Sequence, residues 1–140
     1  WAFATAAVAA PELFEAIAGE ASRRIRGFNS QDMANTAWAF ATVAVAAPLL
    51  FEAIAGEALK RVREFNSQGL TNTVWAFATA AVAAPLLLEA IAGEASGRIR
   101  EFNSQNMANT VWAFATAAVA APLLFEAIAG EALRRVREFN

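Results

Sequence analysis

The chain has 140 residues, of which 58% are hydrophobic, and its 11 Lys and Arg against 13 Asp and Glu give a net charge of −2. This length predicts one domain, and the charge excludes a whole-protein basic field that would attract nucleic acid or an anionic membrane. The absence of Cys and His excludes thiol chemistry, disulfides, cysteine or histidine zinc sites and imidazole catalysis, so we expect no metal and no cofactor.

A repeat of 37 residues organises the chain. It is marked at the same step by Trp1, Trp38, Trp75 and Trp112 and by Pro11, Pro48, Pro85 and Pro122. Such a period is typical of a solenoid, because one unit cannot bury its apolar face without stacking on its neighbours. The sequence therefore predicts a single all-α solenoid of antiparallel helix pairs, with units 1–28 (truncated), 29–65, 66–102 and 103–140. We expect this array to be part of a longer one, with flanking repeats of the same chain.

The first helix of the second unit, helix A, is expected from Ser30 to Ala46, capped by Asn29 and Ser30 and stopped before Pro48. At about 100° per residue its apolar residues fall on one arc, which predicts a core face. That face comprises Met33, Ala34, Ala37, Trp38, Phe40, Ala41, Ala44 and Val45. The tryptophan and phenylalanine rows are therefore predicted to be core, and the opposite arc is a stripe of amides and hydroxyls.

The second helix of the unit, helix B, is expected from Pro48 to Phe65, since proline suits a first helical position. It carries nearly all the charge, and a Glu precedes an Arg by four residues in every unit. The pairs are Glu20 with Arg24, Glu57 with Arg61, Glu94 with Arg98 and Glu131 with Arg135. Such spacing suits ion pairs on a helix surface, so helix B is predicted to be the solvated outer helix and helix A the inner one.

Across units, the uncharged stripe of helix A forms rows. They are Gln31, Gln68, Gln105; Asn35, Asn72, Asn109; and Thr42, Thr79, Thr116. One position in the stripe changes in every copy, being Asp32, Gly69 or Asn106. Elsewhere helix A hardly varies, so this position is the one that distinguishes the units.

The stretch Gln31 to Ala41 and the proline that begins the next helix resemble the octotricopeptide repeats and the related heptatricopeptide repeats, which have a 37-residue period. The matching residues are Gln31, Met33, Ala34, Asn35, Thr36, Trp38, Ala39, Phe40 and Ala41. The resemblance covers the whole chain. It implies an α-solenoid of a chloroplast or mitochondrion that binds RNA, in order to stabilise, process or help translate transcripts, or that sits on ribosomal RNA.

If the array binds single-stranded RNA, amides would read splayed bases and arginines would hold phosphates. The candidate base-reading residues are Asp32, Asn35, Gly69, Asn72, Asn106 and Asn109, and the candidate phosphate-binding residues are Arg26, Arg63, Arg100 and Arg137. Structural roles explain the same residues: the amides can bond to one another between helices, Asp32 can be a first-turn acid, and the arginines can be solvated or paired with Glu.

Two functions from different classes stay open, an RNA-binding array and a protein-binding scaffold in a larger organellar assembly. The resemblance favours RNA, and the charge balance favours a scaffold. The uncharged run Phe65 to Leu88 is not expected to span a membrane, because Pro85 interrupts it and alanine contributes little to insertion. We expect no enzyme, because surface glutamates without a nucleophile and base pair offer no site with catalytic roles.

Overall fold

The computed structural model describes residues 11–117 and 121–139. Within them the chain forms α2 (Pro11–Arg23), η1 (Ile25–Gly27), α3 (Ser30–Val43), α4 (Pro48–Lys60), η2 (Val62–Glu64), α5 (Ser67–Thr79), α6 (Pro85–Gly97), η3 (Ile99–Glu101), α7 (Ser104–Thr116) and α8 (Pro122–Phe139). The described residues contain no strand, and the predicted all-α solenoid is confirmed. Trp1 and the rest of the first unit's helix A lie outside them.

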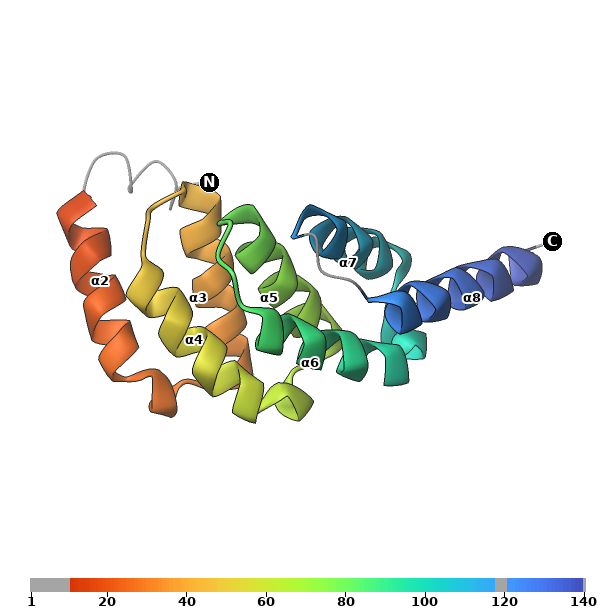
Figure 1. Cartoon of the computed structure of the whole chain (residues 1–140), viewed down its shortest axis with the longest axis horizontal. Helices are drawn as coiled ribbons and strands as arrows, with labels where there is room; N and C mark the ends of the chain where they lie inside the picture. The colour runs from red at the N-terminus through yellow and green to blue at the C-terminus, as the bar shows by residue number, and fades with distance from the viewer. Residues whose placement is uncertain (1–10, 118–120, 140) are drawn as a thin grey trace.

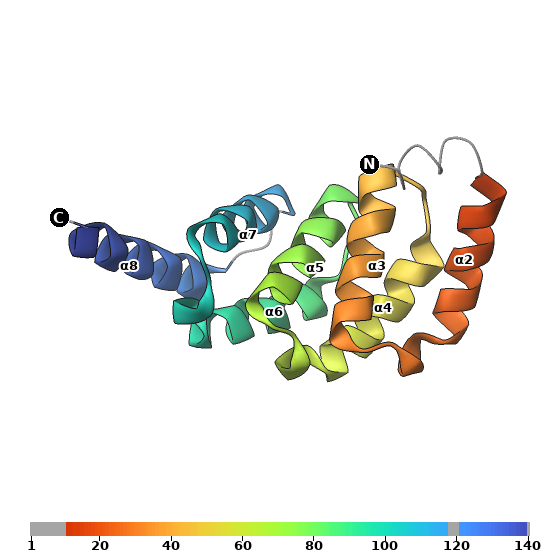
Figure 2. The same ribbon diagram turned by 180° about the vertical axis from the view of Figure 1, so that it is seen from behind.

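The helices stack in two layers (Figure 1). The A layer consists of α3, α5 and α7, and the B layer of α2, α4, α6 and α8. Each helix packs mainly on the next member of its own layer, and the A helices lie in closer contact with one another than the B helices do. When the helices of one layer pack more closely, the array curves so that this layer lies on its concave side. The packing therefore agrees with the prediction that the A helices are the inner ones. Figure 2, in which the molecule is turned by 180°, shows the A layer in front.

The helix starts follow the sequence signals. Asn29, Asn66 and Asn103 accept a hydrogen bond from the backbone N–H three residues later, at 2.7 Å in each unit. This satisfies one of the N–H groups that a helix start otherwise leaves without a partner. The B helices begin at Pro11, Pro48, Pro85 and Pro122. Both signals are local, which is why the sequence could supply them.

Both helices of the second unit end earlier than predicted. Helix α3 ends at Val43 rather than Ala46, because Ala44 adopts a left-handed conformation with φ of 57°. The next unit repeats this feature at Ala81, also with φ of 57°. Helix α4 ends at Lys60, and the chain tightens into the 3-10 helix η2 before it reaches Phe65.

Phenylalanines fill the space between the layers, as predicted. Phe14 meets Phe40 edge to face with 5.9 Å between ring centroids, and Phe51 meets Phe77 in the same way at 5.1 Å. All four side chains are at most 2% exposed. Such pairs add about 0.5–1.5 kcal/mol to the stabilisation that comes from burying the rings.

The predicted Glu and Arg pairs form, but three of the arginines do not lie on a solvated face. The Arg135 side chain is 24% exposed, and its Nη2 donates to the Arg100 carbonyl at 3.3 Å. The Arg61 and Arg98 side chains are only 20% and 21% exposed. Each reaches back to the preceding unit, where Arg61 Nη1 donates to the Phe28 carbonyl at 2.5 Å and Arg98 Nη1 donates to the Phe65 carbonyl at 2.7 Å. The prediction that they lie on the outer face is wrong, because the angular positions within one helix do not show contacts with the preceding unit.

Candidate functional site

An exposed stripe runs along each A helix. In α3 it consists of Gln31, Asn35, Trp38 and Thr42, which are spaced four, three and four residues apart, and all four are exposed. Spacings of three and four residues place side chains on one face of a helix. The equivalent residues are Gln68, Asn72, Trp75 and Thr79 in α5, and Gln105, Asn109, Trp112 and Thr116 in α7. We call the three stripes together the A-layer face.

The tryptophans belong to this face, and the prediction that they are core is wrong. Trp38 is 42% exposed and Trp112 is 47% exposed, with Trp75 partly buried between them. Trp38 follows Gln31 by seven residues, which is about 20° short of two full turns, so it lies beside the polar stripe. The prediction gave hydrophobicity more weight than this angle. The phenylalanine row, in contrast, is core.

The three indoles form a continuous row across the units. Ring centroids of Trp38 and Trp75 lie 6.2 Å apart with 30° between their planes, and those of Trp75 and Trp112 lie 6.5 Å apart with 31° between them. The row is thus apolar, aromatic and open to solvent. It offers a surface on which flat, apolar or aromatic groups of a ligand can stack.

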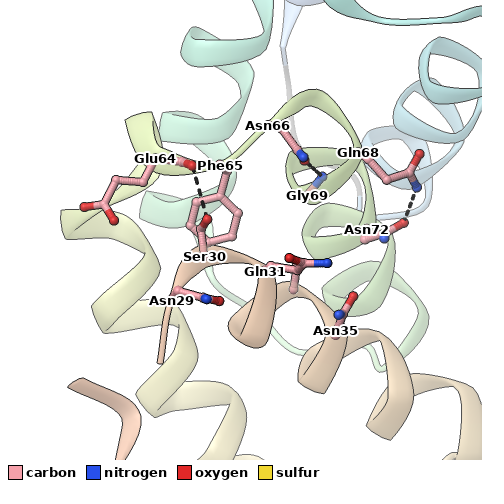
Figure 3. A pocket seen from close by; sticks show the side chains of 11 residues that line it. Asn29, Ser30, Gln31, Asn35, Glu64, Phe65, Asn66, Gln68, Gly69 and Asn72 are labelled. Carbon is pink, nitrogen blue, oxygen red and sulfur yellow. Dashed lines mark hydrogen bonds between the residues drawn. The ribbon is translucent and has the colours of Figure 1, made fainter. Parts of the chain in front are cut away.

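A polar cleft with a volume of about 310 Å³ lies between the N-terminal halves of α3 and α5. Its lining includes Gln31 and Asn35 from α3, and Gln68, Gly69 and Asn72 from α5. Figure 3 shows the two groups on opposite sides of the cleft, with the Gln68 amide turned away from α3. Gln31 and Asn35 make no side-chain hydrogen bond to any residue that the structure describes. Their amide groups are therefore available to a ligand.

The amides at the next junction, between α5 and α7, are paired. Asn106 is 4% exposed, and its Nδ2 donates to Gln68 Oε1 at 2.9 Å. Gln68 Nε2 in turn donates to Asn72 Oδ1 at 2.9 Å. Below them, the hydroxyls of Thr71 and Thr110 lie 3.2 Å apart. The structural interpretation of the amide rows thus holds at this junction.

The predicted base-reading residues divide into three groups. The cleft brings together Asn35, Gly69 and Asn72. Asn109 lies partly buried on α7, outside this cleft. Asp32 and Asn106 complete capping boxes. Asp32 Oδ2 accepts from the Asn29 N–H at 3.1 Å, as a first-turn acid would, and Asn106 Oδ1 accepts from the Asn103 N–H at 3.3 Å.

The residues that sequence reasoning missed are the three tryptophans, and it left the glutamine row without a role. The sequence contained a signal for both, because Gln31 and Trp38 lie four residues before and three residues after Asn35 and therefore share its face of the helix.

The candidate phosphate-binding arginines lie at the ends of the B helices. Arg26, Arg63 and Arg100 are exposed in η1, η2 and η3, and Arg137 is exposed in α8. None of the four pairs with an acid that the structure describes. Glu64 lines the cleft, but its carboxylate is turned away from the cleft (Figure 3). Glu64 also binds Arg61 at 3.1 Å, and this hydrogen bond is the main cause that raises the pKa of Arg61.

Two further findings concern metal binding and membrane crossing in the described part of the chain. Its acidic residues form no group of three or more that could hold a metal ion. Among its helices, none combines the length and hydropathy that a bilayer crossing needs.

The fold and this face define a helical-repeat binding protein whose A layer presents amides and stacked indoles. A family model for the RNA-editing substrate-binding complex 6 protein matches residues 2–140, and the chain belongs to this family. The match supports an all-helical protein related to RNA processing, and it does not single out the octotricopeptide or heptatricopeptide repeats. A comparison with curated proteins finds no match.

Proposed function

We propose that the chain is an RNA-binding subunit of an organellar RNA-processing assembly and that it contacts single-stranded RNA through the A-layer face. One observation carries the proposal, namely the row of Trp38, Trp75 and Trp112 beside unpaired amides. Single-stranded RNA is recognised by stacking of its bases on aromatic side chains and by hydrogen bonds to their edges. The family's name, which refers to binding the substrate of RNA editing, supports the same ligand.

The face is neutral, so we propose that it binds bases and that phosphates bind elsewhere. Arg26, Arg63 and Arg100 recur once per unit, exposed and without an acidic partner among the described residues. They are the side chains we expect to contact phosphates. The proposal is of a binding protein and not an enzyme, because amides and indoles are neither nucleophiles nor general bases at neutral pH. RNA-editing complexes are of kinetoplastid mitochondria. Of the two organelles considered, the mitochondrion is therefore the one we propose.

The test is the affinity of the chain for short, fluorescently labelled single-stranded RNA, measured by anisotropy. Stacking on one aromatic residue contributes about 1–3 kcal/mol. The double variant Trp38→Ala and Trp112→Ala should therefore weaken binding at least roughly tenfold. Both indoles also pack against Trp75, so affinity is compared at a temperature at which circular dichroism shows the variant to be folded.

The matched control removes exposed apolar groups from the other layer. Leu49 and Leu86 are 74% and 67% exposed on the B layer, and their change to alanine should leave RNA affinity unchanged. Loss of affinity in the control, or unchanged affinity in the tryptophan variant, contradicts binding through the A-layer face. Change of Arg63 to Ala should weaken binding uniformly across sequences and reduce the salt dependence by about one phosphate contact.

A protein-binding scaffold is the second candidate, and one observation favours it. Leu49, Leu86 and Leu123 are 67–75% exposed and occupy the second position of three successive B helices. Exposed apolar rows of this kind are typical of protein interfaces. If the scaffold function is the right one, the wild-type chain will show no affinity for RNA. Substitution of these leucines by serine will then release the chain from its assembly.

A further inference from the structure

One residue decides whether a cleft is open between two A helices. The third residue of α5 is Gly69, and the third residue of α7 is Asn106. At the α5 and α7 junction, the Asn106 side chain crosses to Gln68 and closes the gap with a 2.9 Å hydrogen bond. At the α3 and α5 junction, Gly69 has no side chain to reach Gln31, which is the equivalent of Gln68. The polar cleft is the space that remains.

A second difference between the junctions acts in the same direction. Thr71 contacts Thr110 across the α5 and α7 junction, with 3.2 Å between the hydroxyl oxygens. In α3 the residue equivalent to Thr71 is Ala34, which has no hydroxyl and lines the cleft. Two cross-links that tie α5 to α7 are thus absent between α3 and α5.

The cleft favours a neutral ligand with adjacent donors and acceptors. The amides of Gln31 and Asn35 each offer one carbonyl and one NH₂ group, and Asn72 keeps its NH₂ group free because only its carbonyl is used by Gln68. The lining contains no Lys or Arg, which disfavours a phosphate. A volume of about 310 Å³ lies at the small end of ligand pockets.

The geometry points to this cleft as a binding pocket for one nucleobase, and to the α5 and α7 junction as closed to bases. The inference rests on the proposed function, since the strand that supplies the base is the one stacked on the tryptophan row. Trp38 lies one turn beyond Asn35 on the same stripe. The tryptophan row and the cleft are therefore adjacent, and one base of a strand stacked on the row can enter the cleft. The amides of Gln31 and Asn35 then bond to its edge, as amides do to adjacent donors and acceptors of bases.

Reciprocal substitutions test this assignment, because each junction is the control for the other. Gly69→Asn should close the cleft, and Asn106→Gly should open a second one. A Cβ at residue 69 would lie 3.2 Å from Asn66 Oδ1 and 3.3 Å from Phe65 Cδ2, so these neighbours must shift slightly. Asn106 has equivalent neighbours, Asn103 and Phe102, and is accommodated there. Gln31→Met is the second cleft variant, since it removes the amide without filling the cleft, and Leu86→Ala, on the exposed B layer, is the control.

The first measurement uses ribonucleosides, which contain no phosphate, and the side-chain amide signals in NMR spectra of nitrogen-15 labelled chain. We expect shifts at Gln31, Asn35 and Asn72 and none at Gln105. Gly69→Asn and Gln31→Met should abolish them, and Asn106→Gly should add a shift at Gln68. Shifts of the same signals by inorganic phosphate, or no shift by any nucleoside, would overturn the assignment of the cleft to a base.

The second measurement separates the cleft from the proposed function. Gly69→Asn and Gln31→Met should lower affinity for single-stranded RNA roughly tenfold. Leu86→Ala, which changes an exposed side chain of the B layer, should not. If both cleft variants bind RNA as tightly as the wild type while the tryptophan variant does not, the cleft inference fails and the proposed function stands. If the wild type itself does not bind RNA, the proposed function fails. The inference then fails with it.

Discussion

Arg98 links two units of the array, and its removal is the sharpest test of how the stack is stabilised. Its Nη1 donates to the Phe65 carbonyl, 33 residues earlier in the chain, at 2.7 Å. It also pairs with Glu101 at 3.1 Å and with Glu94 at 3.4 Å. These acids raise the pKa of Arg98, the hydrogen bond to Glu101 first. We consider Arg98→Met, which keeps most of the apolar stem and removes the guanidinium.

The magnitude follows from what the guanidinium contacts. A hydrogen bond between a charged group and a carbonyl contributes about 1.5–3 kcal/mol, whereas exposed ion pairs contribute about 0–1 kcal/mol. Met retains the packing of the stem. We therefore expect the free energy of unfolding to fall by about 2 kcal/mol. For a chain of this size, that change lowers the melting temperature by roughly 4–8 °C.

The assay is urea and thermal unfolding followed by far-ultraviolet circular dichroism, with Arg100→Met as the control. Arg100 lies two residues further on, is exposed, and pairs with no acid among the described residues. Its change should alter stability by less than about 0.5 kcal/mol. Equal stability of Arg98→Met and Arg100→Met would refute the reasoning. The carbonyl contact would then contribute nothing, and Arg98 would belong to a solvated face after all.

Three other changes should also move stability in a predictable direction. Asn29→Ala removes the cap of α3 and should cost about 1 kcal/mol in chemical unfolding. Ala81→Gly relieves a left-handed alanine and should add up to about 1 kcal/mol, whereas Ala83→Gly, at negative φ, should not. Hydrogen bonding to Arg134 lowers the pKa of Glu131 from about 4.5 to about 2. The stability from this carboxylate is therefore present above pH 4.5 and lost as the pH falls toward 2, and Glu131→Gln should flatten that part of an acid titration monitored by circular dichroism.

The features that sequence reasoning predicted correctly depend on residues close together in the chain. Asn29 caps the N–H of Asp32 and Pro48 begins α4, so each signal and its effect lie within one turn. The phenylalanine row needed only helical periodicity. The 37-residue period then implied stacking, because identical units with an apolar face have their own copies as neighbours.

The features that it missed depend on contacts between units or on the exact helical angle. Arg61 has a carbonyl partner 33 residues earlier, and no pattern within one helix encodes that contact. Trp38 was placed in the core because it is large and apolar, although its position beside Gln31 on the wheel placed it at the edge of the stripe. Its neighbour there is Trp75, whose ring covers part of it and makes an exposed tryptophan less costly.

The third position of each A helix shows how near-identical units can have different surfaces. The N–H groups of Asp32, Gly69 and Asn106 all donate to a capping asparagine at 2.7 Å. The first bond of the cap therefore uses the backbone of this position, and the Asp32 and Asn106 side chains add a second bond that Gly69 lacks. Helix α5 begins without that second bond, so substitution there mainly changes what faces the preceding unit. Because the rest of the helix is committed to stacking, this is the position at which one junction can be opened or closed without disturbing the array.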